Sequence, residues 1–120
     1  MTAAVPAARN PANGLQVAVD GPVTRIVLDR PERRNALTRE MVTGLIELVG
    51  AASADDTTRV IVLRGAGGNF CAGMDLGQAN DSRGSAPRTG HLERRVAVLA
   101  HRLVQVMLGA EVPIVTVVEG

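Results

Sequence analysis

The chain has 120 residues and a net charge of +1, with 46% hydrophobic and 21% charged residues. This length allows one domain, and the composition is typical of a soluble globular protein. Phe70 is the single aromatic residue, so the chain has no platform on which bases could stack. The low net charge gives no basic surface to attract phosphates, and both observations argue against a nucleic-acid-binding protein. No apolar run reaches the length of a membrane span, and the N-terminus lacks the pattern of a secretory signal.

Three residue types limit the chemistry further. Cys71 is the single cysteine and cannot form an internal disulfide, which fits a reducing compartment, and we expect a cytoplasmic protein. All basic residues are arginine, so this chain has no lysine nucleophile. His91 and His101 do not have the i, i+4 spacing that would place two metal ligands on one helix face, so we expect no metal site.

The first predicted elements form a hairpin. Residues 1–14 combine small residues with prolines and predict a disordered tail, which leaves a domain over residues 15–120. Leu15–Val19 alternates apolar residues with polar or small ones, as in a half-buried strand. Asp20-Gly21 is a strong turn signal, and residues 23–28 form the second strand.

A charged loop and a helix follow. We expect residues 29–35 to be irregular, because Pro31 blocks regular structure. Thr38 is a suitable N-cap for a helix that ends at Asp55-Asp56. Its apolar residues recur at helical spacing and predict a buried stripe. The stripe consists of Met41, Leu45, Leu48, Val49 and Ala52.

The second half alternates strand and helix. Residues 60–63 are a continuous apolar run, which predicts a strand covered on both faces. Gln78–Gly90 is rich in small and polar residues and predicts a mobile loop. A second helix is expected from His91 or Leu92 to about Leu108, with Val96, Leu99, Leu103, Val106 and Met107 as its apolar stripe. Pro113 then opens a last strand.

The glycine-rich segment Gly65–Leu76 is the main candidate for function. It follows a strand, and glycine lets bare backbone N–H groups come close to a ligand. Amides held in this way suit a phosphate or the oxyanion of an acyl-transfer intermediate. The alternative is a plain connection in which glycine serves only sharp turning.

Three segments in register resemble the crotonase superfamily, the enoyl-CoA hydratase/isomerase family. Asn69–Leu76 is similar to its loop, and Arg30–Leu37 to its segment from arginine-proline to Asn-Ala-Leu. Val112–Gly120 is similar to the strand that leads to its second oxyanion glycine. The resemblance covers roughly residues 15–120. It implies an α/β, crotonase-like fold built from ββα repeats, of which this chain holds the N-terminal part.

The resemblance also implies an activity in fatty acyl-CoA metabolism. In this family two backbone N–H groups bind the carbonyl oxygen of an acyl-CoA thioester and stabilise the enolate that develops from it. The first donor would be the N–H of Met74, whose side chain would line the acyl pocket. Acyl-CoA is then the substrate, and neither a further cofactor nor a metal is implied.

The contacts to CoA follow from the same motif. It places four residues against the ligand: Ala72, Gly73, Met74 and Asp75. Ala72 and Asp75 correspond to backbone contacts with the adenine and pantetheine parts. Arg33 or Arg34 falls where the family often has a basic residue near the CoA phosphates, and arginine's planar fork suits that role. These arginines could instead belong to a solvated loop.

The remaining catalytic groups of the family would lie beyond Gly120. They are the second oxyanion glycine and the two carboxylates that hydratases use as general acid and base. Glu119 stands at a variable position before that glycine. We therefore expect a chain truncated after Gly120 and inactive as a hydratase alone, from a family that forms trimers or pairs of trimers. The alternatives are a non-catalytic module that binds CoA or another subunit, and a remnant without function.

Overall fold

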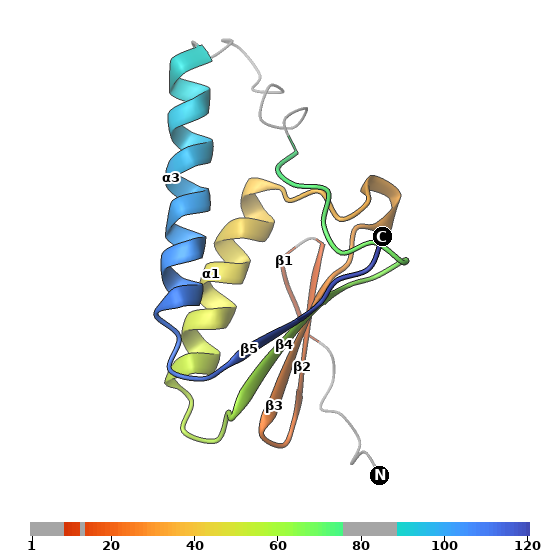
Figure 1. Cartoon of the computed structure of the whole chain (residues 1–120), viewed down its shortest axis with the longest axis vertical. Coiled ribbons are helices and arrows are strands. Elements are labelled where there is room, and N and C mark those ends of the chain that lie inside the picture. Colours follow the sequence, from red (N-terminus) through yellow and green to blue (C-terminus); the bar gives the residue numbers. More distant parts are fainter. Residues whose placement is uncertain (1–8, 13, 76–88) are drawn as a thin grey trace.

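The computed structural model describes residues 9–12, 14–75 and 89–120. These residues form two layers, a β-sheet and the helices that pack on one of its faces (Figure 1). The strands are β1 (Arg9–Ala12), β2 (Leu15–Asp20), β3 (Val23–Leu28), β4 (Val60–Gly65) and β5 (Ile114–Val117). The helices are the 3₁₀ turn η1 (Pro31–Arg33), α1 (Arg39–Ala54) and α3 (Thr89–Leu108). The strands form one sheet in the order β1-β2-β3-β4-β5. Its first three strands are antiparallel, whereas β3, β4 and β5 run parallel.

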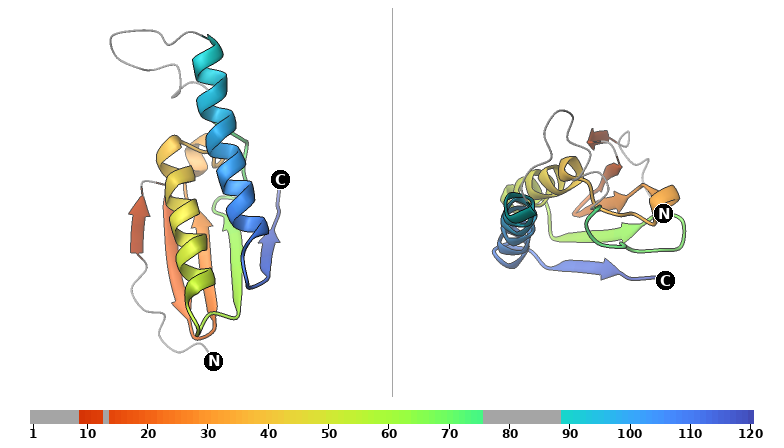
Figure 2. Two further views of the ribbon diagram at one scale, coloured as in Figure 1. Left: turned by 90° about the vertical axis from the view of Figure 1, so that its left-hand side faces the viewer. Right: turned by 90° about the horizontal axis from the view of Figure 1, so that it is seen from above.

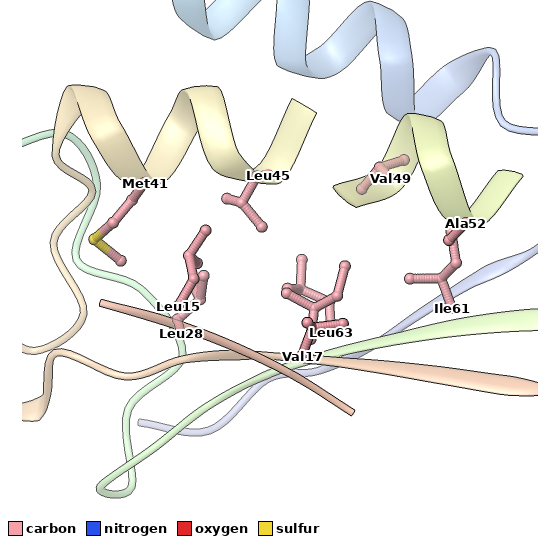
Figure 3. Packing of buried hydrophobic residues seen from close by; sticks show 10 residues of the cluster. Leu15, Val17, Leu28, Met41, Leu45, Val49, Ala52, Ile61 and Leu63 are labelled. Carbon is pink, nitrogen blue, oxygen red and sulfur yellow. The ribbon is translucent and has the colours of Figure 1, made fainter. Parts of the chain in front are cut away.

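The hydrophobic core lies between one face of this sheet and α1. Both helices lie side by side on that face (Figure 2), and α3 packs against α1. The buried side chains of β2, β3 and β4 meet the apolar stripe of α1 (Figure 3). The core residues are Leu15, Val17, Ile26, Leu28, Met41, Leu45, Val49, Ala52, Ile61 and Leu63.

The predicted start and buried face of α1 are confirmed. Thr38 is the N-cap, and its hydroxyl oxygen accepts a hydrogen bond from the N–H of Met41 at 3.1 Å. The predicted stripe is buried except for Leu48, which is half-buried. Helix α1 ends at Ala54, immediately before the predicted stop signal.

The hairpin is confirmed as well. Strands β2 and β3 pair from Leu15↔Leu28 to Asp20↔Val23, so the turn falls where the sequence placed it. The predicted stripe of α3 agrees at Leu103, Val106 and Met107, which pack on the core, while the side chain of Val96 lies outside the described residues.

The prediction that the strand at residues 60–63 is covered on both faces is wrong. Ile61 and Leu63 are buried under α1, whereas Val62 on the other face is only half-buried and Arg64 is exposed. The described helices cover one face of the sheet only. Arg64 follows Val60 and Val62 on the outward face of this strand, and its charge was the sequence signal that this face is not covered.

The expected irregular segments also need correction. Within the predicted disordered tail of residues 1–14, Arg9–Ala12 pairs antiparallel with β2, while residues 1–8 and 13 lie outside the described residues. Strand β1 lies at the edge of the sheet, where proline is tolerated, so Pro11 does not prevent pairing. Pro31 stands at the start of η1, because proline fits the first position of a helical turn.

The predicted loop over Gln78–Gly90 is only partly open to comparison. Residues 78–88 lie outside the described residues, and α3 already includes Thr89 and Gly90, two residues before the predicted start at His91. Within the part of the chain that the structure describes, no helix combines the length and hydrophobicity needed to cross a bilayer.

Candidate oxyanion and CoA site

Two loops meet at the carboxyl ends of β3 and β4. Residues 29–37 follow β3, and residues 66–75 follow β4. The two strands are parallel, with Leu28 opposite Gly65, so the loops leave the sheet at the same edge. Figure 1 shows them side by side, with the C-terminal residues of the chain next to them.

Asn35 joins the two loops through its side chain. The residue is fully buried, and its Nδ2 donates to the carbonyl oxygens of Ala66 at 2.9 Å and Asn69 at 2.7 Å. Its Oδ1 accepts from the N–H of Arg30 at 2.8 Å. Its backbone is left-handed, with φ of +58°, a conformation that asparagine adopts more readily than most residues. Asn35 was part of the motif seen in the sequence, but the pattern assigned it no role.

Two glycines of the second loop are required by this close contact. A Cβ on Gly65 would overlap the carbonyl oxygen of Asn69 and lie 2.7 Å from Nδ2 of Asn35. A Cβ on Gly67 would lie 2.6 Å from Cβ of Pro31, and Gly67 has a φ of +78°. Gly65 therefore serves close packing within its own loop and against Asn35, and Gly67 serves packing between the two loops.

Met74 lies where the two loops pair through their backbones. Leu37 and Met74 form an isolated parallel bridge, in which the N–H of Leu37 donates to Gly73 O at 2.7 Å. The N–H of Asp75 in turn donates to Leu37 O at 2.9 Å. A trans peptide unit points its C=O and N–H in opposite directions. Since Gly73 O faces Leu37, the N–H of Met74 points away from Leu37.

Most of the neighbouring amides have partners inside the protein. Four N–H groups between residues 70 and 75 donate as follows: Phe70 to Glu119 O, Ala72 to Arg34 O, Gly73 to the sulfur of Cys71 at 3.3 Å, and Asp75 to Leu37 O. In the same run, the amides of Cys71 and Met74 donate to no group within the described residues. Gly73 has a φ of +101° with open space around it, so it serves the turn that presents Met74.

The charged residues of the site fall into two groups. Nη1 of Arg30 donates to Asp75 Oδ2 at 2.8 Å and to Ala36 O at 3.0 Å, and this ion pair is about one-fifth exposed. Asp75 is thus engaged by both its carboxylate and its N–H. Arg33 and Arg34 are exposed beside the loop, and the carbonyl of Arg34 holds Ala72.

The other reactive side chains show no comparable arrangement. Cys71 is half-buried, and His101 is exposed on α3. The side chain of His91 lies outside the described residues. Among residues with a described placement, no cluster of His, Cys, Asp and Glu could hold a metal ion. An open depression of about 440 Å³ lies between the C-terminal ends of α1 and α3, at the opposite end of the sheet from the two loops.

Comparisons with known proteins find relatives for the part of the chain that contains both loops. Residues 23–120 match the family model described as enoyl-CoA hydratase/isomerase. The chain is 42% identical over 87 residues to the 1,2-epoxyphenylacetyl-CoA isomerase of Escherichia coli, covering 71% of this chain and 33% of that protein. It is 48% identical over 62 residues to the enoyl-CoA hydratase AKT3-2 of Alternaria alternata, covering 48% of this chain and 21% of that protein.

A solved structure shares the fold. An enoyl-CoA hydratase/isomerase from Xanthobacter autotrophicus Py2 superposes with a TM-score of 0.80 at 29% identity, covering 91% of this chain and 39% of that one. The chain therefore spans about a fifth to a third of the length of the first curated relatives it matches. It spans about two-fifths of the solved chains.

Proposed function

Because the chain belongs to the enoyl-CoA hydratase/isomerase family, we propose that its two loops form one side of an acyl-CoA thioester site. The crotonase-like fold inferred from the sequence is confirmed for this N-terminal part by the solved structures. In the proposed site, the N–H of Met74 donates to the thioester carbonyl oxygen and stabilises the enolate formed from it.

The direction of the Met74 N–H carries the proposal. Leu37 fixes the peptide between Gly73 and Met74, so this donor is aimed before any ligand arrives. A donor that is already oriented stabilises developing negative charge without rearranging during the reaction. Loss of one such donor raises a reaction barrier by about 2.7–4 kcal/mol in a complete active site.

The CoA contacts follow from the groups that remain. The carbonyl of Ala72 accepts no hydrogen bond within the described residues, and we assign to it the contact with the adenine part that the family motif implies. We assign the CoA phosphates to Arg33 and Arg34, which are exposed beside Ala72. We assign the carboxylate of Asp75, which pairs with Arg30, to the support of the loop, and the backbone of Asp75 to the contact with the pantetheine part that the family motif implies.

The proposed reaction also needs groups that we assign to none of the described residues. We propose that a second N–H donor and the acid–base carboxylates come from residues beyond Gly120. The carbonyl of Glu119 accepts a hydrogen bond from the N–H of Phe70 at 3.0 Å, so the residues around Glu119 lie next to the second loop. We expect no hydration of crotonyl-CoA by the 120-residue chain, and turnover followed at the enoyl absorbance would overturn this expectation.

The donor is tested with two matched ligands. Butyryl-CoA has a thioester carbonyl, whereas S-butyl-CoA carries a methylene in its place. The carbonyl preference is defined as the Kd of S-butyl-CoA divided by the Kd of butyryl-CoA, both from isothermal titration. One hydrogen bond of about 1 kcal/mol predicts a carbonyl preference of about fivefold for the chain.

Two variants separate the N–H of Met74 from its side chain. Met74→Pro removes the N–H and should lower the carbonyl preference to about one, because proline has no backbone donor. Met74→Ala keeps the N–H and should retain the preference while changing the affinity for longer acyl groups. An unchanged preference in Met74→Pro, with a wild-type circular dichroism spectrum, would exclude Met74 as the donor.

A second candidate function is a non-catalytic interaction module. Strand β5 is at the edge of the sheet and exposes apolar side chains, with Val115 at 50% and Val117 at 42%. Helix α3 exposes Leu108 at 82%. Light scattering over a range of concentrations tests self-association through this side. A mass that stays at 12.5 kDa throughout would argue against it.

A further inference from the structure

Asn35 is in position to control the direction of the Met74 N–H from a distance. We propose that Asn35 is a positioning residue whose side-chain amide keeps this donor aimed at the thioester carbonyl. The inference rests on the proposed function, since it concerns the same donor. It assigns a role to a side chain that is buried and does not face a ligand.

The first step of the argument is the burial of the amide. Asn35 is fully buried, and its three side-chain hydrogen bonds use both Nδ2 and Oδ1. Two carbonyl oxygens, of Ala66 and Asn69, converge on one NH₂ group. Without that group these two part-buried carbonyl oxygens would lose their donors, which disfavours the present arrangement of the second loop.

The second step is the backbone between Asn35 and Met74. Residues 34–37 run alongside residues 72–75, and three backbone hydrogen bonds join them. Arg34 O accepts from Ala72, Leu37 N donates to Gly73 O, and Leu37 O accepts from Asp75. Asn35 lies inside this run, so a shift of Asn35 moves Leu37, and Leu37 sets the plane of the peptide that carries the Met74 N–H.

The third step is the need for an amide at this position. Aspartate has nearly the same shape, but its carboxylate would place negative charge against two carbonyl oxygens and donate to neither. Glycine keeps the left-handed backbone but provides no donor. The two substitutions therefore remove the same two hydrogen bonds by different means, and a positioning role predicts the same functional result for both.

The experiment measures the carbonyl preference of N35D and N35G beside the wild-type chain. We expect the preference to fall from about fivefold to about one in both variants, while the affinity for S-butyl-CoA stays within about twofold. Circular dichroism shows whether each variant is folded, and N35G decides the question if N35D does not fold. Val49→Ala provides a control of general destabilisation, because Val49 is buried in the core and belongs to neither loop. Its carbonyl preference should remain at about fivefold.

The outcomes separate the two proposals. A wild-type chain without carbonyl preference contradicts the proposed function and removes the basis for this inference. A wild-type preference that persists in folded N35D or N35G overturns the role of Asn35 and leaves Met74 as the donor. Equal weakening of both ligands with an unchanged ratio also overturns it, because Asn35 would then support the whole site without aiming the donor.

Discussion

The core beneath α1 and the two loops at the carboxyl ends of β3 and β4 are held together by different interactions. The core consists of aliphatic side chains and methionine, such as Leu28, Met41 and Leu45, and depends on the removal of apolar surface from water. The loops contain few buried apolar side chains and depend on directed hydrogen bonds around Asn35 and Leu37. The core therefore determines how stable the chain is, and the loops determine where the Met74 N–H points.

Removal of a core side chain should give the largest loss of stability. Leu45 is 3% exposed in the middle of α1, so Leu45→Ala leaves a cavity and is expected to lower the free energy of unfolding by about 2–5 kcal/mol. Urea denaturation followed by circular dichroism measures this change. Val104→Ala, at a side chain that is 51% exposed on α3, should stay within about 0.5 kcal/mol. Equal effects in the two variants would contradict the assigned core.

A methyl group at the start of the second loop should have the next largest effect. Gly65→Ala places a Cβ against the carbonyl oxygen of Asn69 and is expected to destabilise by about 1–3 kcal/mol. Unlike Leu45→Ala, it should also lower the carbonyl preference of the folded chain, because the loop must move. Gly50→Ala is the matched control: nothing lies near its Cβ in α1, and it should stabilise by about 1 kcal/mol. A Gly65→Ala variant with wild-type stability would show that Gly65 is not packed closely against Asn69 and Asn35.

The helix cap lies between the two regions and should have a smaller effect. Thr38→Ala removes the acceptor for the N–H of Met41 and should lower the free energy of unfolding by about 1 kcal/mol. Thr43→Ala, at an exposed position within the same helix, should have no such effect. We expect the carbonyl preference to survive in Thr38→Ala, because the hydroxyl forms its hydrogen bond with Met41 and none with residues 66–75. Its loss would mean that the two regions are coupled through the start of α1.

The smallest predicted effect concerns acid pH at the far end of α1. Hydrogen bonds from the Thr57 hydroxyl, and then from its N–H, lower the pKa of Asp55 below its ordinary value. A lowered pKa in the folded state means that this contribution to stability is present above the unfolded-state pKa and is lost as the pH falls through the folded-state pKa. Asp55→Asn should therefore remove a small part of the destabilisation seen below about pH 4. An NMR titration that finds an unshifted pKa at Asp55 would contradict this prediction.

Sequence patterns were sufficient for the elements that depend on neighbouring residues. The alternation of Leu15–Val19, the Asp20-Gly21 turn and the Thr38 cap each depend on a few consecutive positions, and each is confirmed. Strand β1 was missed because its four residues carry no strand pattern and form a strand only by pairing with β2. The uncovered face of β4 was missed because an apolar run does not show which of its faces a helix covers.

The candidate site divides in the same way. The motif located Met74, but the direction of its N–H depends on Leu37, which is far away in the sequence. The hydrogen bonds from Asn35 to Ala66 and Asn69, and the ion pair of Arg30 with Asp75, also join distant positions, 31 to 45 residues apart. Sequence patterns left open whether the glycines of Gly65–Leu76 serve a ligand or a turn, whereas the structure places the backbone of Asn69 and the side chain of Asn35 against Gly65. Side-chain contacts of this kind follow from the assembled sheet and cannot be read from local spacing.

Asn35 is far in sequence from the residues that its side-chain amide binds, and this has a consequence for the order of folding. Its bonds to Ala66 and Asn69 can form only after β3 and β4 have paired, because until then the two loops belong to distant parts of the chain. Contacts that close long segments form late when they stabilise little by themselves. Substitutions at Asn35 should therefore accelerate unfolding more than they slow folding. Their kinetic φ-values, the ratio of the change in folding barrier to the change in stability, should be near zero. The donor at Met74 would then be the last part of the domain to acquire its shape and the first to lose it.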